Sequence, residues 1–269
     1  MRSAVAEISS ARVALVTGAA RGIGAASARR LASAGYRVVA MDWCTGATSE
    51  APYPQAARAD LEAVAKPFED RVIPYIGDVR DSDAVIDAVS QATTRWGRLD
   101  VAVAAAAVIA GGRPQWVTPA EHLDAQWSIN AKGMWNTAAA AIPVMLAGPD
   151  PRGCRFVGIA SVAATSGLFH LSAYNMSKHA VAGLIRGLAA DLAGTGVTAT
   201  AVSPGSTDTV MLKATADLYN VSTDDLIQHQ GLRRVLDPDE IAAVVAFCCS
   251  REAAALNGSI VNADGGFGL

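Results

Sequence analysis

Three residues in the second half of the chain carry side chains that can move a proton: Ser161, Tyr174 and Lys178. Tyr174 and Lys178 have helical i, i+4 spacing, so on a helix they share one face. An ammonium group beside a phenol favours the phenolate, which lowers the tyrosine pKa and lets the side chain work as an acid or base near neutral pH. Ser161 follows an apolar run and is expected to hydrogen-bond a substrate oxygen. A Tyr-x-x-x-Lys pair often marks only a solvated helix face, but the serine behind a strand favours a catalytic set.

A glycine pattern near the N-terminus is typical of a dinucleotide site. The run TGAARGIG, residues 17–24, follows the first apolar run and opens the first helical segment. Glycines let the backbone turn sharply and approach a pyrophosphate, and the helix N-terminus presents free N–H groups to it. We therefore expect Gly18, Arg21, Gly22 and Ile23 to contact a dinucleotide.

Asp42 ends the second apolar run and precedes Trp43. In dinucleotide folds an acidic residue at this point accepts hydrogen bonds from the adenosine ribose and repels a 2′-phosphate. Arg21 is the counter-argument, because a basic residue in the glycine-rich turn suits a 2′-phosphate. The carboxylate occupies the place of that phosphate, so the sequence favours NAD over NADP. The alternative is an aspartate that only caps a turn.

Short apolar runs alternate with Ala-rich helical segments and must position these residues. Several runs are apolar on both faces, as in strands of a parallel sheet covered by helices. The pattern predicts an α/β Rossmann fold, a doubly wound parallel seven-stranded sheet with helices on both faces, as a single domain over residues 1–269. The expected strands are 12–17, 37–42, 71–76, 99–106, 155–160, 197–203 and 259–261, and the expected helices include 23–34, 83–96 and 173–193.

Two long segments interrupt this alternation. Residues 43–68 contain Pro52, Pro54 and Pro67, which predicts an irregular insertion near the cofactor before a helix at 56–66. Residues 206–236 are polar and lie between the last two strands, so we expect a substrate lid. Either segment could instead be a surface decoration.

Composition excludes several classes of partner. The chain has 22 Lys+Arg and 25 Asp+Glu, a net charge of −3 that does not attract nucleic acid or anionic membranes. Its longest apolar run, 101–110, is about half of the roughly 20 residues that a membrane span requires. No secretion signal is recognisable, so a cytoplasmic protein is expected. The four cysteines lack CxxC spacing and no histidine has a partner at ligand spacing, which predicts reduced thiols and no metal.

Taken together, the motifs resemble those of the short-chain dehydrogenase/reductase family along nearly the whole chain. Residues 17–24 match its TGxxxGxG pattern, Asp78-Val79 its adenine contact, and Ser161, Tyr174 and Lys178 its catalytic set. Asn130 matches the fourth catalytic position, and Pro204-Gly205 the nicotinamide turn, with Thr209 at the carboxamide position. The terminal Asp264-Gly265-Gly266 also matches the family's ending.

The resemblance implies a mechanism in which Tyr174 exchanges a proton with the substrate oxygen while hydride moves to or from the nicotinamide. Lys178 would hold the ribose hydroxyls, Ser161 would orient the reacting oxygen, and Asn130 would steady a water that links Lys178 to solvent. NAD supplies the hydride chemistry. The full set of expected cofactor contacts is Gly18, Arg21, Gly22, Ile23, Asp42, Trp43, Asp78, Val79, Ala105, Tyr174, Lys178, Pro204, Gly205, Thr207 and Thr209.

One departure from the family lies after the fourth strand. The family commonly has Asn-Asn-Ala-Gly there, whereas residues 104–107 are four alanines. Backbone contacts to the adenosine side, through Ala105, can survive this change. The side-chain hydrogen bonds and the close approach of a glycine cannot.

The insertion suggests a narrower resemblance. The Pro52-Tyr53-Pro54 segment, with residues 59–61, 108–112 and 201–211, is similar to the mycofactocin-coupled, carveol-dehydrogenase-like branch of the family. In that branch the insertion is thought to cover NAD, which stays bound and passes electrons to an external redox carrier. The insertion could equally serve subunit contacts or shield the adenine in an ordinary dehydrogenase.

The expected substrate pocket is mainly apolar, which implies a small, mainly apolar alcohol or ketone. His170 lies in the loop between Ser161 and Tyr174 and could be exposed instead. The residues expected to line the pocket are Ala163, Leu168, Phe169, His170, Met211 and Leu212.

A homotetramer also follows from the resemblance. Residues 121–146, expected as one helix disturbed near Pro143, and 173–193 resemble the family's helix-pair interface. Ala182, Gly183 and Gly187 permit close packing either there or within one chain. The aromatic residues of this region are Trp116, Trp127 and Trp135.

The leading prediction is an NAD-dependent enzyme that interconverts a secondary alcohol and a ketone. A 3-oxoacyl-[acyl-carrier-protein] reductase is the alternative, disfavoured by Asp42 and by the lack of a basic patch for an acidic carrier protein. A non-catalytic dinucleotide sensor is more remote, because all four catalytic positions are intact. Tyr174→Phe discriminates, since an enzyme would lose turnover while still holding nucleotide.

Overall fold

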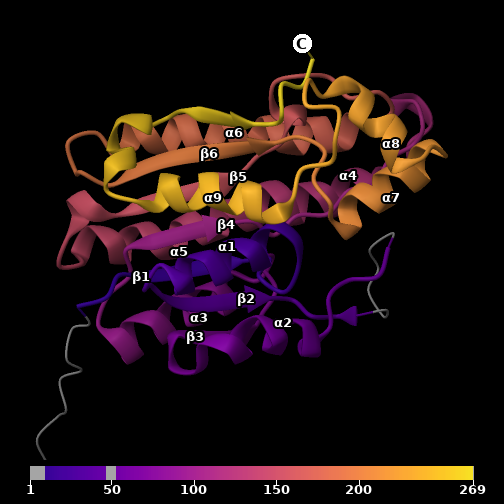
Figure 1. Cartoon of the computed structure of the whole chain (residues 1–269). Coiled ribbons are helices and arrows are strands. Elements are labelled where there is room, and N and C mark those ends of the chain that lie inside the picture. The colour runs from indigo at the N-terminus through magenta and orange to yellow at the C-terminus, as the bar shows by residue number, and fades with distance from the viewer. Residues whose placement is uncertain (1–9, 47–52, 269) are drawn as a thin grey trace, which may run out of the picture.

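The computed structural model describes residues 10–46 and 53–268 of the chain. Seven strands form one parallel sheet in the order β3-β2-β1-β4-β5-β6-β7 (Figure 1). The predicted α/β architecture and its seven-stranded parallel sheet are confirmed. The strands are β1 Val13–Thr17, β2 Arg37–Asp42, β3 Val72–Ile76, β4 Val101–Ala104, β5 Arg155–Ile159, β6 Thr198–Pro204 and β7 Ile260–Ala263.

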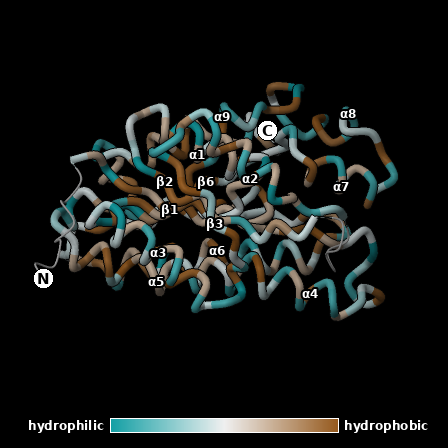
Figure 2. The backbone as a smooth tube through the Cα atoms, turned by 90° about the horizontal axis from the view of Figure 1, so that it is seen from below, coloured by the Kyte–Doolittle hydropathy of each residue, from teal (hydrophilic) through white to brown (hydrophobic). Residues whose placement is uncertain are grey.

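Helices cover both faces of the sheet. Figure 2 shows α1 and α9 on one side of the hydrophobic strands and α3, α5 and α6 on the other. Within the described residues, no helix is both long and apolar enough to cross a membrane. The helices are α1 Gly22–Ser33, α2 Arg58–Ala65, α3 Ser82–Trp96, α4 Ala120–Gln126, α5 Gly133–Ala147, α6 Ser172–Asp191, α7 Val210–Tyr219, α8 Thr223–Leu226 and α9 Pro238–Cys249.

Alternating side chains of each central strand enter two separate cores. In β1, Val13 and Leu15 pack with residues of α3, α5 and α6. Ala14 and Val16 pack with residues of α1, α2 and α9. Because both sides of the strand are buried, its sequence is continuously apolar rather than alternating.

The order of the strands reverses between β1 and β4. The chain leaves β1 toward β2 and β3, then returns to place β4 on the other side of β1. Loops at the carboxyl ends of these two strands therefore diverge, which opens a crevice at the carboxyl end of the sheet. Helices α4, α7 and α8 lie together at one end of the sheet (Figure 1).

Two local predictions need correction. β4 covers only 101–104, not 99–106, because the apolar residues beyond it form a loop that crosses the crevice. The predicted helix 121–146 is disturbed at a π-helical turn, Trp127–Lys132, whereas Pro143 lies within α5. At this turn the buried side chain of Asn130 hydrogen-bonds the backbone of Val108.

The two long segments both contain ordered structure. The predicted helix at 56–66 is confirmed as α2, and a backbone bridge joins Thr45 to Ala57 before it. Pro52 of the expected insertion lies outside the described residues. The expected lid 206–236 contains α7 and α8, and a backbone bridge between Thr207 and Leu236 closes its base.

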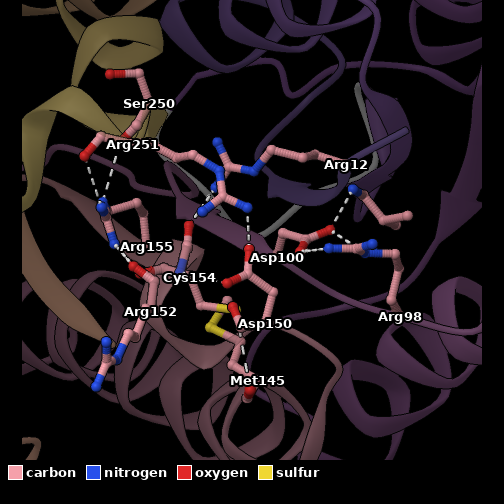
Figure 3. Close-up of polar contacts among 12 residues, drawn as sticks. Arg12, Arg98, Asp100, Met145, Asp150, Arg152, Cys154, Arg155, Ser250 and Arg251 are labelled. Carbon is pink, nitrogen blue, oxygen red and sulfur yellow. Dashed lines mark hydrogen bonds and ion pairs between the residues drawn. The ribbon is translucent and has the colours of Figure 1, made fainter. Parts of the chain in front are cut away.

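A network of arginines joins the amino ends of the strands (Figure 3). Arg98 pairs with Asp100 at 2.6 Å, and Asp100 also accepts a 2.8 Å hydrogen bond from the backbone N–H of Val13. Arg155 is buried and donates to the carbonyls of Ser250 and others along the same edge. These bonds connect the amino ends of β1, β4 and β5 with the C-terminal end of α9. This end of the sheet lies opposite the crevice.

Candidate active site

A cavity of about 780 Å³ occupies the carboxyl end of the sheet. Its size lies within the range of small-molecule and cofactor sites. All fifteen expected cofactor contacts line it. Among the other predicted site residues, those that line it are Ser161, Leu168, Phe169, Met211 and Leu212, and those that do not are Asn130, Ala163 and His170.

The glycine-rich turn forms a cradle in which side chains have no room. Gly18 has a φ of +67°, and a Cβ there would lie 2.7 Å from the backbone of Ala106. A Cβ on Gly24 would lie 2.0 Å from the carbonyl oxygen of Gly18. The N-cap residue of α1, Arg21, makes no side-chain cap, because a guanidinium carries only donors and cannot accept from the free N–H groups of the helix. The turn therefore suits a pyrophosphate that approaches the backbone closely.

The other end of the crevice carries a carboxylate and an aromatic ring. Asp42 accepts hydrogen bonds from the backbone N–H groups of Ala20 at 3.0 Å and Cys44 at 3.2 Å. The guanidinium of Arg80 lies 4.3 Å from the ring centroid of Trp43 and pairs with Asp78 at 2.7 Å. This arrangement fits an adenosine whose ribose hydroxyls meet Asp42, and the negative charge opposes a 2′-phosphate.

The alanine segment after β4 is held by hydrogen bonds from other elements. The hydroxyl of Thr17 accepts from the N–H of Ala105 at 3.2 Å and of Ala106 at 3.5 Å. Ala105, Ala106 and Ala107 all line the cavity. Thr17 thus supplies an anchor where the family's asparagines are missing, and Gly18 lets the glycine-rich turn lie close to the backbone of Ala106.

Ser161, Tyr174 and Lys178 converge on the cavity from two elements. Ser161 follows β5, and Tyr174 and Lys178 lie on α6 with the ammonium 5.8 Å from the phenol ring centroid. Lys178 donates a 2.9 Å hydrogen bond to the carbonyl of Ile159. The phenol of Tyr174 donates to the sulfur of Met211 at 3.9 Å.

Burial dominates the pKa values of Tyr174 and Lys178. It raises the pKa of Tyr174 to about 12; the neighbouring hydroxyl of Ser161 lowers this pKa, and Tyr53 raises it further. Burial likewise lowers the pKa of Lys178 to about 8. Desolvation therefore favours the neutral form of both side chains.

The side chain of Asn130 is held by the backbone of a neighbouring loop. Its side chain exchanges two hydrogen bonds with Val108, at 2.8 and 2.9 Å, and donates a third to the hydroxyl of Ser177 at 3.0 Å. Gln126, one turn earlier, makes the same exchange with Ala110. The π-helical turn places both amides against residues 108–110, so these amides position the cavity wall.

The substrate end of the cavity is largely apolar, as predicted. Leu168 and Met211 pack around a buried cluster that includes Tyr174 and Ile109. His170 adopts a φ of +55° and stacks on Phe169, with ring centroids 3.6 Å apart, outside the cavity lining. Ala163 belongs to the cluster but is fully buried behind the lining.

Several residues of the cavity lie outside the predicted site. These include Thr215, Tyr219 and His229 of the segment 206–236 and Phe267 near the C-terminus. Tyr53 of the insertion also lines the cavity. The prolines on either side of Tyr53 indicated an irregular segment but not where its ring would lie.

Comparison with known proteins agrees with this geometry. The family model described as enoyl-(acyl carrier protein) reductase matches residues 18–268. An uncharacterised NAD-dependent oxidoreductase of Mycobacterium tuberculosis is 32% identical over 95% of both chains, and acetoacetyl-CoA reductase of Shinella zoogloeoides is 31% identical over 95% of this chain and 98% of its own. The crystal structure of carveol dehydrogenase from Mycobacterium avium in complex with NAD superimposes with a TM-score of 0.88 at 30% identity, over 97% of this chain and 98% of that one.

The family model includes Gly18 and the Ser161, Tyr174 and Lys178 set within the residues it matches. The relatives and the solved structure each match 95% or more of this chain. The chain therefore belongs to the short-chain dehydrogenase/reductase family of oxidoreductases.

Proposed function

We propose that this oxidoreductase uses NAD to interconvert a secondary alcohol and a ketone. The observation that carries the proposal is the convergence of Ser161, Tyr174 and Lys178 on an apolar cavity that is continuous with the glycine cradle. NAD supplies hydride transfer at its nicotinamide. Asp42 favours NAD over NADP, and Lys178 is placed to hold ribose hydroxyls.

In this proposal, Tyr174 exchanges the proton with the substrate oxygen. A neutral phenol donates a proton to a carbonyl oxygen, and the same group accepts the proton back from an alcohol as a phenolate. Ser161 orients the reacting oxygen, and its hydroxyl already lowers the pKa of Tyr174. Lys178, with its pKa lowered to about 8, changes charge within reach of neutral pH.

Tyr174→Phe tests this assignment. Turnover of alcohols with NAD should fall by at least about a thousandfold, because proton transfer contributes 10²–10⁴-fold and the reacting oxygen also loses a hydrogen bond. Nucleotide binding, measured by fluorescence titration with NADH, should remain. A variant that keeps its activity would remove Tyr174 from the mechanism.

The substrate class follows from the apolar wall of Leu168 and Met211. A monocyclic terpenoid alcohol such as carveol is a suitable first probe, since one relative of known structure is a carveol dehydrogenase. A 3-oxoacyl thioester reductase is the second candidate, favoured by similarity to an acetoacetyl-CoA reductase. Reduction of acetoacetyl-CoA with NADPH, faster than oxidation of carveol with NAD, would select it.

We propose further that NAD stays bound through turnover and that an external redox carrier of the mycofactocin type reoxidises it. Arg21 of the glycine-rich turn supports this. It donates to the carbonyl of Pro54 at 2.7 Å and to Gln55 at 3.0 Å, so the insertion is fastened beside the crevice.

The test is to dialyse the purified protein, denature it, and count the nucleotide released per chain. Near-stoichiometric NAD is expected. Arg21→Ala should speed the exchange of bound NAD for added nucleotide, whereas Arg29→Ala, an exposed residue of the same helix, should not. A wild-type protein that emerges empty and turns over with added NAD is an ordinary dehydrogenase.

A homotetramer is proposed from the surface of α4, α5 and α6. Trp116 is 82% and Trp135 62% exposed. Gly183 and Gly187 are exposed on α6, and a Cβ on either would meet nothing within 4 Å, so their small size serves no packing within the described chain. Light scattering should give four chains per particle, and Gly187→Arg should reduce that number. A monomeric wild-type protein would contradict the proposal.

A further inference from the structure

The insertion after β2 reaches the substrate end of the cavity as well as the cofactor. Tyr53 lies 11 residues beyond the end of β2 at Asp42, yet its side chain packs against the cluster of Ile109, Leu171 and Tyr174. It lines the same cavity as Leu168 and Met211. An aromatic ring from the adenosine side of the sheet thus forms part of the wall around the reacting centre.

The position of this ring is set by the glycine-rich turn. The guanidinium of Arg21 lies 5.6 Å from the ring centroid of Tyr53 and donates to Pro54 and Gln55, the next two residues. Gln55 in turn donates to the backbone carbonyl of Tyr53 at 2.9 Å. Hydrogen bonds from Arg21 and from Gln55 therefore hold the backbone next to the ring, so the ring forms a fixed part of the cavity wall.

The ring of Tyr53 supplies the apolar contacts to this cluster. Its phenol oxygen is buried without a well-formed hydrogen bond, and it lies near the backbone of Ile109 and the side chain of Gln55. Burial raises its pKa, so the group is neutral. The ring is close enough to Tyr174 that its phenol raises the pKa of that residue too.

We propose that Tyr53 is a specificity-determining residue whose ring limits the size of the alcohol that reaches Tyr174. This inference rests on the proposed function, because it names a wall of the same substrate site. Apolar pockets discriminate substrates by about 10–200-fold for one methylene group. Removing a whole ring from the wall should therefore relax discrimination against bulky alcohols by at least about tenfold.

The experiment compares cyclohexanol with 4-tert-butylcyclohexanol, with NAD and an artificial electron acceptor present. The measured quantity is the ratio of kcat/KM for the bulky alcohol to that for the small one. Tyr53→Ala should raise this ratio at least about tenfold, mainly through the KM of the bulky alcohol. Tyr53→Phe keeps the ring and should keep the wild-type ratio within about twofold, since the ring that limits the space for the alcohol is still present.

Tyr75→Ala removes a phenol of β3 outside the cavity and serves as the matched control, with an unchanged ratio expected. If Tyr53→Ala does not fold, Tyr53→Leu repeats the test with a smaller apolar side chain. The proposal is overturned if the ratio is unchanged in the Ala or Leu variant, if Tyr53→Phe shifts it equally, or if a folded variant loses both activities. If the wild-type protein oxidises cyclohexanol, these outcomes contradict the role of Tyr53 and leave the proposed function standing. If the wild-type protein oxidises neither alcohol, both proposals are contradicted.

Discussion

Lys178 offers the sharpest physical test of the site, because its burial makes stability depend on pH. Its pKa is about 8 in the folded protein against 10.5 for an exposed lysine. Between these values the unfolded chain binds one more proton than the folded chain, so the free energy of unfolding rises with pH. The two pKa values differ by about 2.5, and a pKa difference of one corresponds to about 1.36 kcal/mol. The free energy of unfolding should therefore rise by about 3 kcal/mol between pH 8 and pH 10.5. Below pH 8 both states are protonated and the contribution is constant.

Lys178→Met removes the titrating group while keeping a long apolar side chain. Urea unfolding of both proteins, freed of nucleotide, from pH 7 to pH 10.5 isolates the effect, because every other titrating group cancels in the difference. The stability of the wild type relative to the variant should rise by about 3 kcal/mol over the upper part of this range. Lys132→Met removes an exposed lysine and should keep the wild-type pH slope. Parallel curves for wild type and Lys178→Met would show that Lys178 is not desolvated, and the argument from burial would be wrong.

Three further predictions concern the cradle, the ribose site and the arginine network. Asp42→Ala should raise the ratio of NADP to NAD usage, measured as kcat/KM, at least about tenfold, because a carboxylate no longer opposes the 2′-phosphate; an unchanged ratio would mean that Asp42 does not face the ribose. Gly18→Ala should abolish retention of nucleotide in a folded protein, since its Cβ would lie 2.7 Å from the Ala106 backbone; normal nucleotide content would contradict the cradle. Asp100→Ala should lower the free energy of unfolding by about 3 kcal/mol in urea, because it removes the buried carboxylate that pairs with Arg98 and accepts from the N–H of Val13; a loss below about 1 kcal/mol would show that this carboxylate does not hold the strands together.

The fold could be predicted from the sequence because its strands carry an unusual signal. Residues 13–16 are apolar without alternation, and the structure buries them alternately in one or the other of two cores. Residues 99–106 carry the same signal but only 101–104 form a strand. Composition cannot reveal that the N–H of Ala105 bonds to a hydroxyl of Thr17, 88 residues away, instead of to a neighbouring strand.

The candidate site was predictable to the extent that its residues follow local rules. Helical spacing places Tyr174 and Lys178 on one side of α6 whatever the rest of the chain does. The direction of their pKa shifts does not follow from spacing, because desolvation depends on elements that pack over them from elsewhere, Met211 and Tyr53 among them. His170 fails as a pocket residue for a similar reason, since its positive φ and its stacking on Phe169 are properties of the folded loop.

The elements that are most irregular in sequence all meet at the glycine-rich turn. Arg21 fastens the insertion, and a Cβ on Gly22 would lie 3.1 Å from the methyl group of Thr209, the residue that caps the first helix of the lid. The backbone of Gly18 packs closely against the alanine segment after β4. A pyrophosphate held in this turn would therefore touch the turn that contacts the insertion, the segment 206–236 and the alanine segment. We therefore expect cofactor binding and the shape of the substrate wall to be coupled, because residues of this one turn, Arg21, Gly22 and Gly18, contact all three segments.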